Sequence, residues 1–127
     1  MKRLQFSSLL IVCFIIMTAC SSENIEKITI YEMENFSAVK EETATDFNMK
    51  EEIEVFQKAF NSAVKQSGIV NMADPNYKVN LGEKSYFIWI SEGSGTIMNT
   101  KDTHTIYSLT NKSAEEVYEL IVNRYVN

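Results

Sequence analysis

Residues 85–90 form the most apolar segment of the chain after its first twenty residues. In an extended segment, successive side chains point to opposite faces. One face then carries Tyr86, Ile88 and Ile90, and the other carries Phe87 and Trp89. A strand that is apolar on both faces needs cover on both sides, which favours a central position in a sheet. We therefore expect the domain to be built around this strand.

Alternating apolar residues predict further strands on either side of this one. The expected strands cover residues 25–31, 77–81, 96–99 and 103–109. Residues 32–47 are acidic and weakly patterned, which is compatible with a loop or with a short edge strand.

Two segments have the apolar periodicity of amphipathic helices. The first covers residues 49–67, and its apolar stripe consists of Ile53, Phe56, Phe60 and Val64. Asp46 or Asn48 can cap its start, and Gly68 can end it in a left-handed conformation. The second helix follows residues 113–116, whose sequence Ser-Ala-Glu-Glu fits a capping box.

The order of these elements predicts an α+β fold over residues 25–127, as a single small domain. We expect an antiparallel sheet of about four to five strands, with two helices packed on one face. Short turns between consecutive strands favour a meander.

The first twenty residues have the organisation of a secretory signal peptide. Lys2 and Arg3 precede an apolar run over residues 9–17, and small residues follow before Cys20. A helix that spans a membrane needs about 20 apolar residues, and this run is too short.

The residues before Cys20 indicate which kind of signal this is. Met17-Thr18-Ala19-Cys20 resembles the lipobox of bacterial lipoproteins. The resemblance implies that the Cys20 thiol receives a diacylglyceryl group and that residues 1–19 are removed. Residues 20–24 would then be a lipidated tether, holding the domain on the extracytoplasmic face of the cell membrane. The alternative is an uncleaved anchor with an incidental cysteine.

The charge of the mature chain argues against nucleic acid as a partner. Removing residues 1–19 takes away Lys2 and Arg3 and no acidic residue, so ten basic residues remain against seventeen acidic ones. The formal net charge changes from −5 to −7, and phosphate backbones require Lys and Arg. Cys13 would be lost with the signal and Cys20 would be acylated, and the domain would then have no disulfide, no cysteine nucleophile and no thiolate zinc site.

His104 is the only histidine, and Asp102 lies two residues before it. On a regular strand the two side chains share a face, where His104 could be a general base or a metal ligand. No nucleophile stands out, and the acidic residues 41–54 lack the alternating ligands and glycine of a calcium loop. A structural role for His104 is favoured, with no metal and no cofactor.

Two short blocks, separated by the strand that carries Trp89, resemble a known family. They are residues 68–77 (Gly-Ile-Val-Asn-Met-Ala-Asp-Pro-Asn-Tyr) and residues 102–107 (Asp-Thr-His-Thr-Ile-Tyr). Both are similar to segments of the YhfM-type small lipoproteins of Gram-positive bacteria. The resemblance covers roughly residues 25–125 and the lipobox, and it implies no established activity.

Three classes of function are compatible with these observations. We favour a non-enzymatic binding or accessory domain at the cell envelope, contacting an envelope protein or a small ligand, with Phe87 and Trp89 as its candidate contact surface. The alternatives are a hydrolase or metal-binding enzyme centred on His104 and Asp102, and a purely structural envelope component. An exposed aromatic patch favours the first class, and a concave pocket around His104 favours the second.

Overall fold

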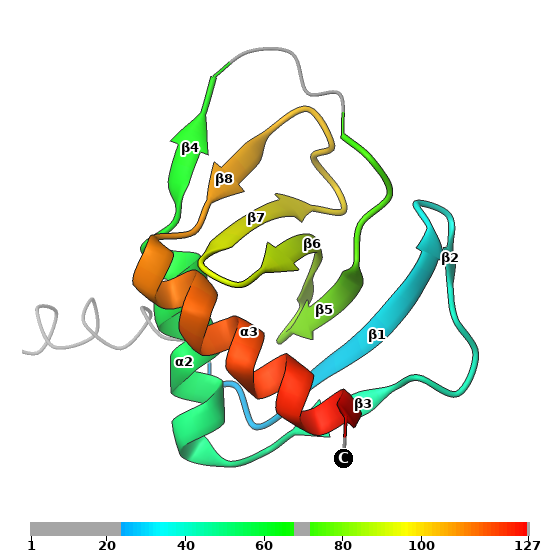
Figure 1. The fold of residues 1–127 in the computed structure, drawn as a ribbon, viewed down its shortest axis with the longest axis vertical. Coiled ribbons are helices and arrows are strands. Elements are labelled where there is room, and N and C mark those ends of the chain that lie inside the picture. Colours follow the sequence, from blue (N-terminus) through cyan, green and yellow to red (C-terminus); the bar gives the residue numbers. More distant parts are fainter. Residues whose placement is uncertain (1–23, 68–71, 127) are drawn as a thin grey trace, which may run out of the picture.

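The computed structural model describes residues 24–67 and 72–126, and these form an eight-stranded antiparallel sheet with two helices (Figure 1). In chain order the elements are β1 (Ile28–Asn35), β2 (Ala38–Val39), β3 (Thr45–Phe47), α2 (Lys50–Asn61), β4 (Val64–Gln66), β5 (Tyr77–Leu81), β6 (Lys84–Ser91), β7 (Ser94–Asn99), β8 (Ile106–Ser108) and α3 (Asn111–Val126). The α+β class expected from the sequence is confirmed.

The strands lie in the order β2-β1-β5-β6-β7-β8-β4, and β3 pairs with β1. The apolar strand β6 is therefore central, as expected, and β5 to β8 form a meander. Two-residue turns join β5 to β6 and β6 to β7, and each contains a glycine at positive φ: 64° at Gly82 and 78° at Gly93. Positive φ suits the tight turns of such hairpins and is accessible to glycine without strain.

The expected number of strands was too low. Residues 32–47 extend β1 to Asn35 and also form β2 and β3, which both pair with β1. Strands of two or three residues are too short to show a period of two. Their pairing is decided by the longer strand that they meet in the folded chain.

The expected first helix was too long. It ends at Asn61, and Ser62 is its C-cap, with its backbone N–H and its hydroxyl both donating to the Lys58 carbonyl, at 3.0 and 2.7 Å. The following residues form β4 on β8, so Val64 leaves the apolar stripe and is exposed. Gly68 lies outside the described residues.

The expected caps of both helices were also wrong. Met49 occupies the N-cap position of α2 without a side-chain hydrogen bond, whereas Asp46 accepts from the Thr29 hydroxyl at 2.8 Å. In α3 the Thr110 hydroxyl accepts from the backbone N–H of Ser113 at 3.1 Å, so the cap precedes the expected capping box.

Both helices pack on the same face of the sheet, as expected (Figure 1). The residues that meet there include Ile30, Val79 and Ile88 from the strands, Phe56 and Ala59 from α2, and Val117 and Ile121 from α3. Edge-to-face ring contacts continue through this core from Phe47 to Phe56 and from Phe56 to Phe60, with centroids 5.3 and 6.4 Å apart. In the described residues, no helix is long and apolar enough to cross a membrane.

Candidate ligand-binding cleft

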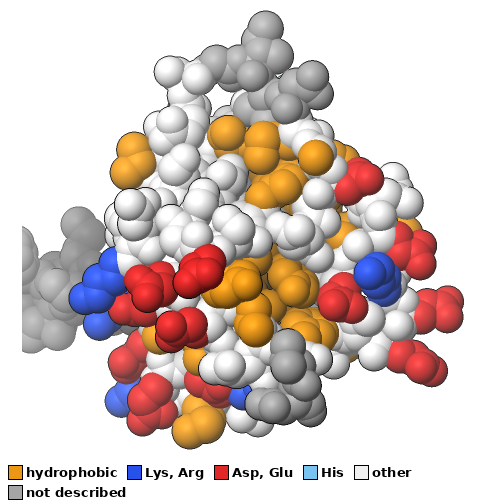
Figure 2. Space-filling model, in the orientation of Figure 1, with side chains coloured by type: hydrophobic (Ala, Val, Ile, Leu, Met, Phe, Trp, Pro, Cys, Tyr) orange, Lys and Arg blue, Asp and Glu red, His pale blue; other side chains and the backbone are white. Residues whose placement is uncertain are grey.

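A cleft of about 230 Å³ opens at the end of α2, between that helix and the helix-facing side of β6, β7 and β8. Its lining consists of Phe60, Lys84, Tyr86, Ile97, Asn99, Asp102, Thr105 and Tyr107. Hydrophobic side chains reach the surface over the strands beyond α3, with acidic side chains on either side (Figure 2).

The floor of the cleft is set by strand register. Tyr86 on β6 lies opposite Asn99 on β7, and Ile97 on β7 lies opposite Tyr107 on β8. Because opposite residues of an antiparallel pair share a face, all four side chains point to the helix side of the sheet. The Phe60 ring meets the Tyr86 ring edge to face, with centroids 4.9 Å apart. The floor is therefore aromatic, with one amide beside it.

The rim of the cleft carries charges of both signs. Lys84 and Asp102 both line it, and no ion pair joins them in the part of the chain that the structure describes. A neighbouring cavity of about 450 Å³ shares Lys84 and Asn99 and adds Glu83 and Lys101. The cleft therefore combines aromatic rings with a larger share of polar groups than most small-molecule sites have.

His104 is not part of this cleft. Residues 100–105 lie outside the strands and β8 begins at Ile106, so the expected strand position of His104 was wrong and Asp102 and His104 share no strand face. The Asp102 carboxylate accepts from the backbone N–H of His104 at 3.3 Å, and the His104 side chain is exposed. Asp102 is thus positioned by an Asx turn, and the structure brings it to Tyr86 and Tyr107 rather than to the imidazole.

Residues 21–126 match the YhfM protein family. The chain belongs to this family. The match extends over the whole sheet and both described helices, whereas no curated protein matches the chain.

A solved structure supports the fold of this YhfM family member. It is the crystal structure of a thioesterase-like protein from Clostridium sporogenes ATCC 15579, with a TM-score of 0.60. The similarity covers 78% of this chain and 95% of that chain, at 18% sequence identity. At this identity the likeness concerns the fold alone.

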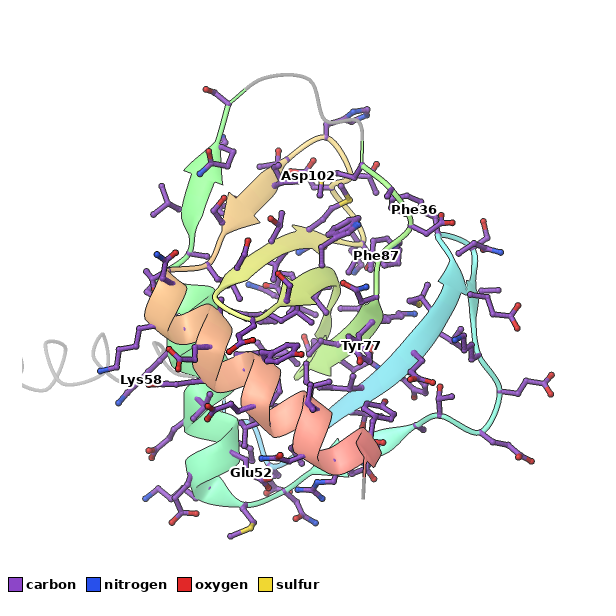
Figure 3. All side chains as sticks on the ribbon, viewed as in Figure 1. Phe36, Glu52, Lys58, Tyr77, Phe87 and Asp102 are labelled. Atoms are coloured by element: carbon purple, nitrogen blue, oxygen red, sulfur yellow. The ribbon has the colours of Figure 1, made fainter. Side chains whose placement is uncertain are left out.

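The face of the sheet away from the helices carries Phe87 and Trp89, the candidate contact residues. Both are half-buried, because the Phe36 ring packs against them with centroids 5.6 and 5.8 Å away (Figure 3). The Trp89 indole donates to the Ala73 carbonyl at 2.8 Å, and Met98, opposite Phe87, is only 3% exposed. Phe36, at 36% exposure, is thus the outermost ring of a self-packed aromatic cluster.

The cleft could not be predicted from the sequence, because its aromatic rings come from three elements that are far apart in the chain. Phe60, Tyr86 and Tyr107 were each assigned to a helix or strand, but nothing in the sequence placed the end of α2 beside β8. The available signal was that Tyr86 shares a strand face with Ile88 and Ile90, but this strand is apolar on both faces, so the alternation did not say which face meets the helices.

Proposed function

We propose that this YhfM family member is a lipid-anchored extracytoplasmic binding domain, and that its ligand occupies the cleft beside Phe60, Tyr86 and Tyr107. The anchor rests on the sequence around Cys20, which lies outside the described residues. The observation that supports the binding function is the cleft, which has an aromatic floor and is also lined by Asn99, Asp102 and Lys84.

The dimensions and chemistry of the cleft define the class of ligand. Its volume of about 230 Å³ is below the roughly 300–1,000 Å³ of sites for drug-sized molecules. It therefore suits a single ring or a short chain end. The aromatic floor provides apolar contact with a ring, while Asn99 both donates and accepts hydrogen bonds. Lys84 donates and Asp102 accepts, so the site favours a polar ligand that is neutral or carries both charges.

Photo-crosslinking in intact cells tests this proposal. A benzophenone amino acid replaces Thr105, in the cleft, and in a second strain it replaces Glu115, an exposed residue on α3 that lies in neither proposed surface. We expect a specific adduct from position 105 that is lost when Asn99 is also changed to Ala, and no such adduct from position 115. The same adducts from both positions, or none from position 105, would contradict binding in the cleft.

The aromatic cluster of Phe36, Phe87 and Trp89 is a proposed second surface, for contact with an envelope protein. Phe36 supports this role because it is a large apolar side chain exposed on the sheet face away from the helices. Phe36→Ser is the appropriate variant, since it removes the outer ring and leaves the two strand residues in place. Unchanged crosslinking of the Phe36→Ser protein to envelope proteins would contradict the proposal.

Hydrolysis of an ester or thioester is the second candidate function. Two observations favour it: the fold is similar to that of a thioesterase-like protein, and the acidic residue Asp102 lines the cleft. Asp102 could activate a water molecule as a general base. Measurement of thioester hydrolysis by the wild type and by Asp102→Asn separates the two candidates. Hydrolysis that is lost in Asp102→Asn favours the enzyme, and equal background rates favour the binding domain.

A further inference from the structure

The distance between the lipid anchor and the domain is short. Three residues, Ser21 to Glu23, separate Cys20 from Asn24, the first residue that the structure describes. Even fully extended, the chain from Cys20 to Asn24 spans at most about 14 Å. If Cys20 is acylated, as the proposed function holds, the part of the domain around Asn24 must lie next to the lipid surface.

Asn24 lies beside the first two turns of α2. Together with Asn48, Lys50, Ile53 and Gln57, it lines a cavity of about 420 Å³. The opposite end of α2 provides Phe60 to the ligand cleft. An α-helix rises 1.5 Å per residue, so about 15 Å along the helix axis separates Lys50 from Phe60. The helix runs from its start near β3 to its end near β4 (Figure 1).

The surface at the start of α2 has the chemistry of an interfacial contact. Met49 precedes the helix with 58% of its surface exposed, and it is a long, flexible apolar side chain. Lys50 follows it, and Lys27 on the adjoining segment has a side chain that is 58% exposed. Lysine stems can lie along an apolar boundary while their ammonium groups reach the polar headgroups.

Acidic side chains balance these lysines. Glu26 and Glu54 line the cavity beside Asn24, and Glu51 lies in the first turn of α2. The surface is therefore not basic, and attraction to anionic lipid does not hold it in place. Contact has to depend on the tether and on the apolar side chain of Met49.

From these relationships we propose an orientation on the membrane. The end of the domain formed by Asn24, Met49 and Lys50 rests on the lipid surface, with Met49 in the headgroup region. The cleft at the opposite end of α2 then opens away from the membrane, where a ligand from outside the cell can reach it. This inference rests on the proposed acylation of Cys20.

Quenching by spin-labelled lipids tests the orientation, with the full protein as cells process it added to phosphatidylcholine vesicles. Met49→Cys and Val64→Cys provide a matched pair, since the two side chains are 58% and 59% exposed and lie beyond opposite ends of α2. The mature chain contains no cysteine other than Cys20, so each variant carries one free thiol for a fluorescent label. We expect a label at position 49 to be quenched at least threefold more strongly than one at position 64.

Each outcome has a distinct meaning. Equal quenching, or stronger quenching at position 64, would overturn the orientation while leaving the anchor intact. Failure of both proteins to bind the vesicles, with no lipid on Cys20, would overturn the anchor itself. Since the contact is proposed to be apolar, adding anionic lipid should change the ratio of quenching less than twofold, and a larger increase would contradict the proposed role of Met49.

Discussion

The ring of Phe60, in the last turn of α2, meets the ring of Tyr86 on the central strand at an interplanar angle of 77°. The two rings pack against the hydrophobic core, and they also form part of the floor of the cleft. Stability and ligand binding are therefore coupled at this position. The folded core determines where the Tyr86 ring lies before any ligand arrives.

The first prediction follows from this contact. Phe60→Ala removes a buried ring, and such a change typically destabilises a protein by about 3–5 kcal/mol. Since small domains are stable by only about 5–15 kcal/mol, the melting temperature should fall sharply. Phe60→Leu retains most of the buried volume and should be destabilised much less. A melting curve for Phe60→Ala close to that of the wild type would show that this side chain is not part of the core.

A second prediction concerns the connection between the two helices. Arg124 on α3 donates to the Glu52 carboxylate on α2 at 2.6 Å and lies over the Phe47 ring, 4.6 Å from its centroid. The Glu52 side chain is only 13% exposed, and its second oxygen has no hydrogen-bond partner within residues 24–67 and 72–126. Arg124→Met should therefore lower the free energy of unfolding by about 1–3 kcal/mol, measured by urea denaturation.

The control for this variant is a weaker ion pair. Lys27 and Asp46 are 4.0 Å apart and at least half exposed, and pairs of this kind contribute about 0–1 kcal/mol. Lys27→Met should thus remain close to the wild type. Equal effects of the two substitutions would contradict a specific role for Arg124.

The third prediction concerns alkaline pH. Tyr125 stacks on Tyr77 with centroids 5.5 Å apart, and its hydroxyl lies 3.0 and 2.8 Å from the carbonyls of Ile30 and Thr43. Burial raises the pKa of Tyr125 above its ordinary value of 10.0, although a hydrogen bond with Thr45 opposes this effect. Burial, and then the charge of Glu32, also raise the pKa of Tyr77.

Since the folded state holds both phenols neutral, their contribution to stability is complete below the unfolded pKa of about 10. It is lost as the pH rises above that value, because the unfolded chain releases these protons first. Tyr125→Phe should weaken the decline in stability above about pH 10, and it should also cost about 1 kcal/mol near neutral pH through the lost hydrogen bond. Urea denaturation across this range provides the measurement, with Tyr31→Phe as a control. An unchanged alkaline decline in Tyr125→Phe would disprove the assignment.

A fourth prediction tests the anchor. Cys20→Ala should abolish incorporation of a fatty-acid analogue, because the thiol is the expected acceptor of the diacylglyceryl group. The variant should remain unprocessed or be released into the medium. Equal labelling of the wild type and Cys20→Ala would exclude acylation at this residue.

The last prediction separates His104 from Asp102. The His104 side chain is exposed, and only the backbone N–H of this residue bonds to Asp102 in the turn. His104→Gln should therefore change the free energy of unfolding by less than about 0.5 kcal/mol. It should also leave crosslinking from the cleft unchanged, whereas Asp102→Asn should reduce it. Loss of cleft function in His104→Gln, with an unchanged melting curve, would place the imidazole in the site.

The sequence by itself determined the elements whose patterns are long. Residues 85–90 are apolar on both faces, and this alone predicted a central strand, which β6 is. The spacing of Ile53, Phe56 and Phe60 likewise predicted the buried stripe of α2. In both segments, several consecutive residues repeat the same preference, so local pattern and tertiary environment agree.

Only the tertiary structure decided the short strands and the cleft. Val64 continues the helical period in the sequence, yet the helix ends at Asn61 and Val64 lies on β4, where it pairs with the edge that β8 provides. Because Asp102 and His104 are close in the sequence, their side chains were expected to act together. In the structure, Asp102 belongs to an Asx turn and lines the cleft with Tyr86 and Tyr107. Segments of two or three residues carry too little local preference to determine their own conformation. Their positions depend on the partner strand and helix that packing brings to them.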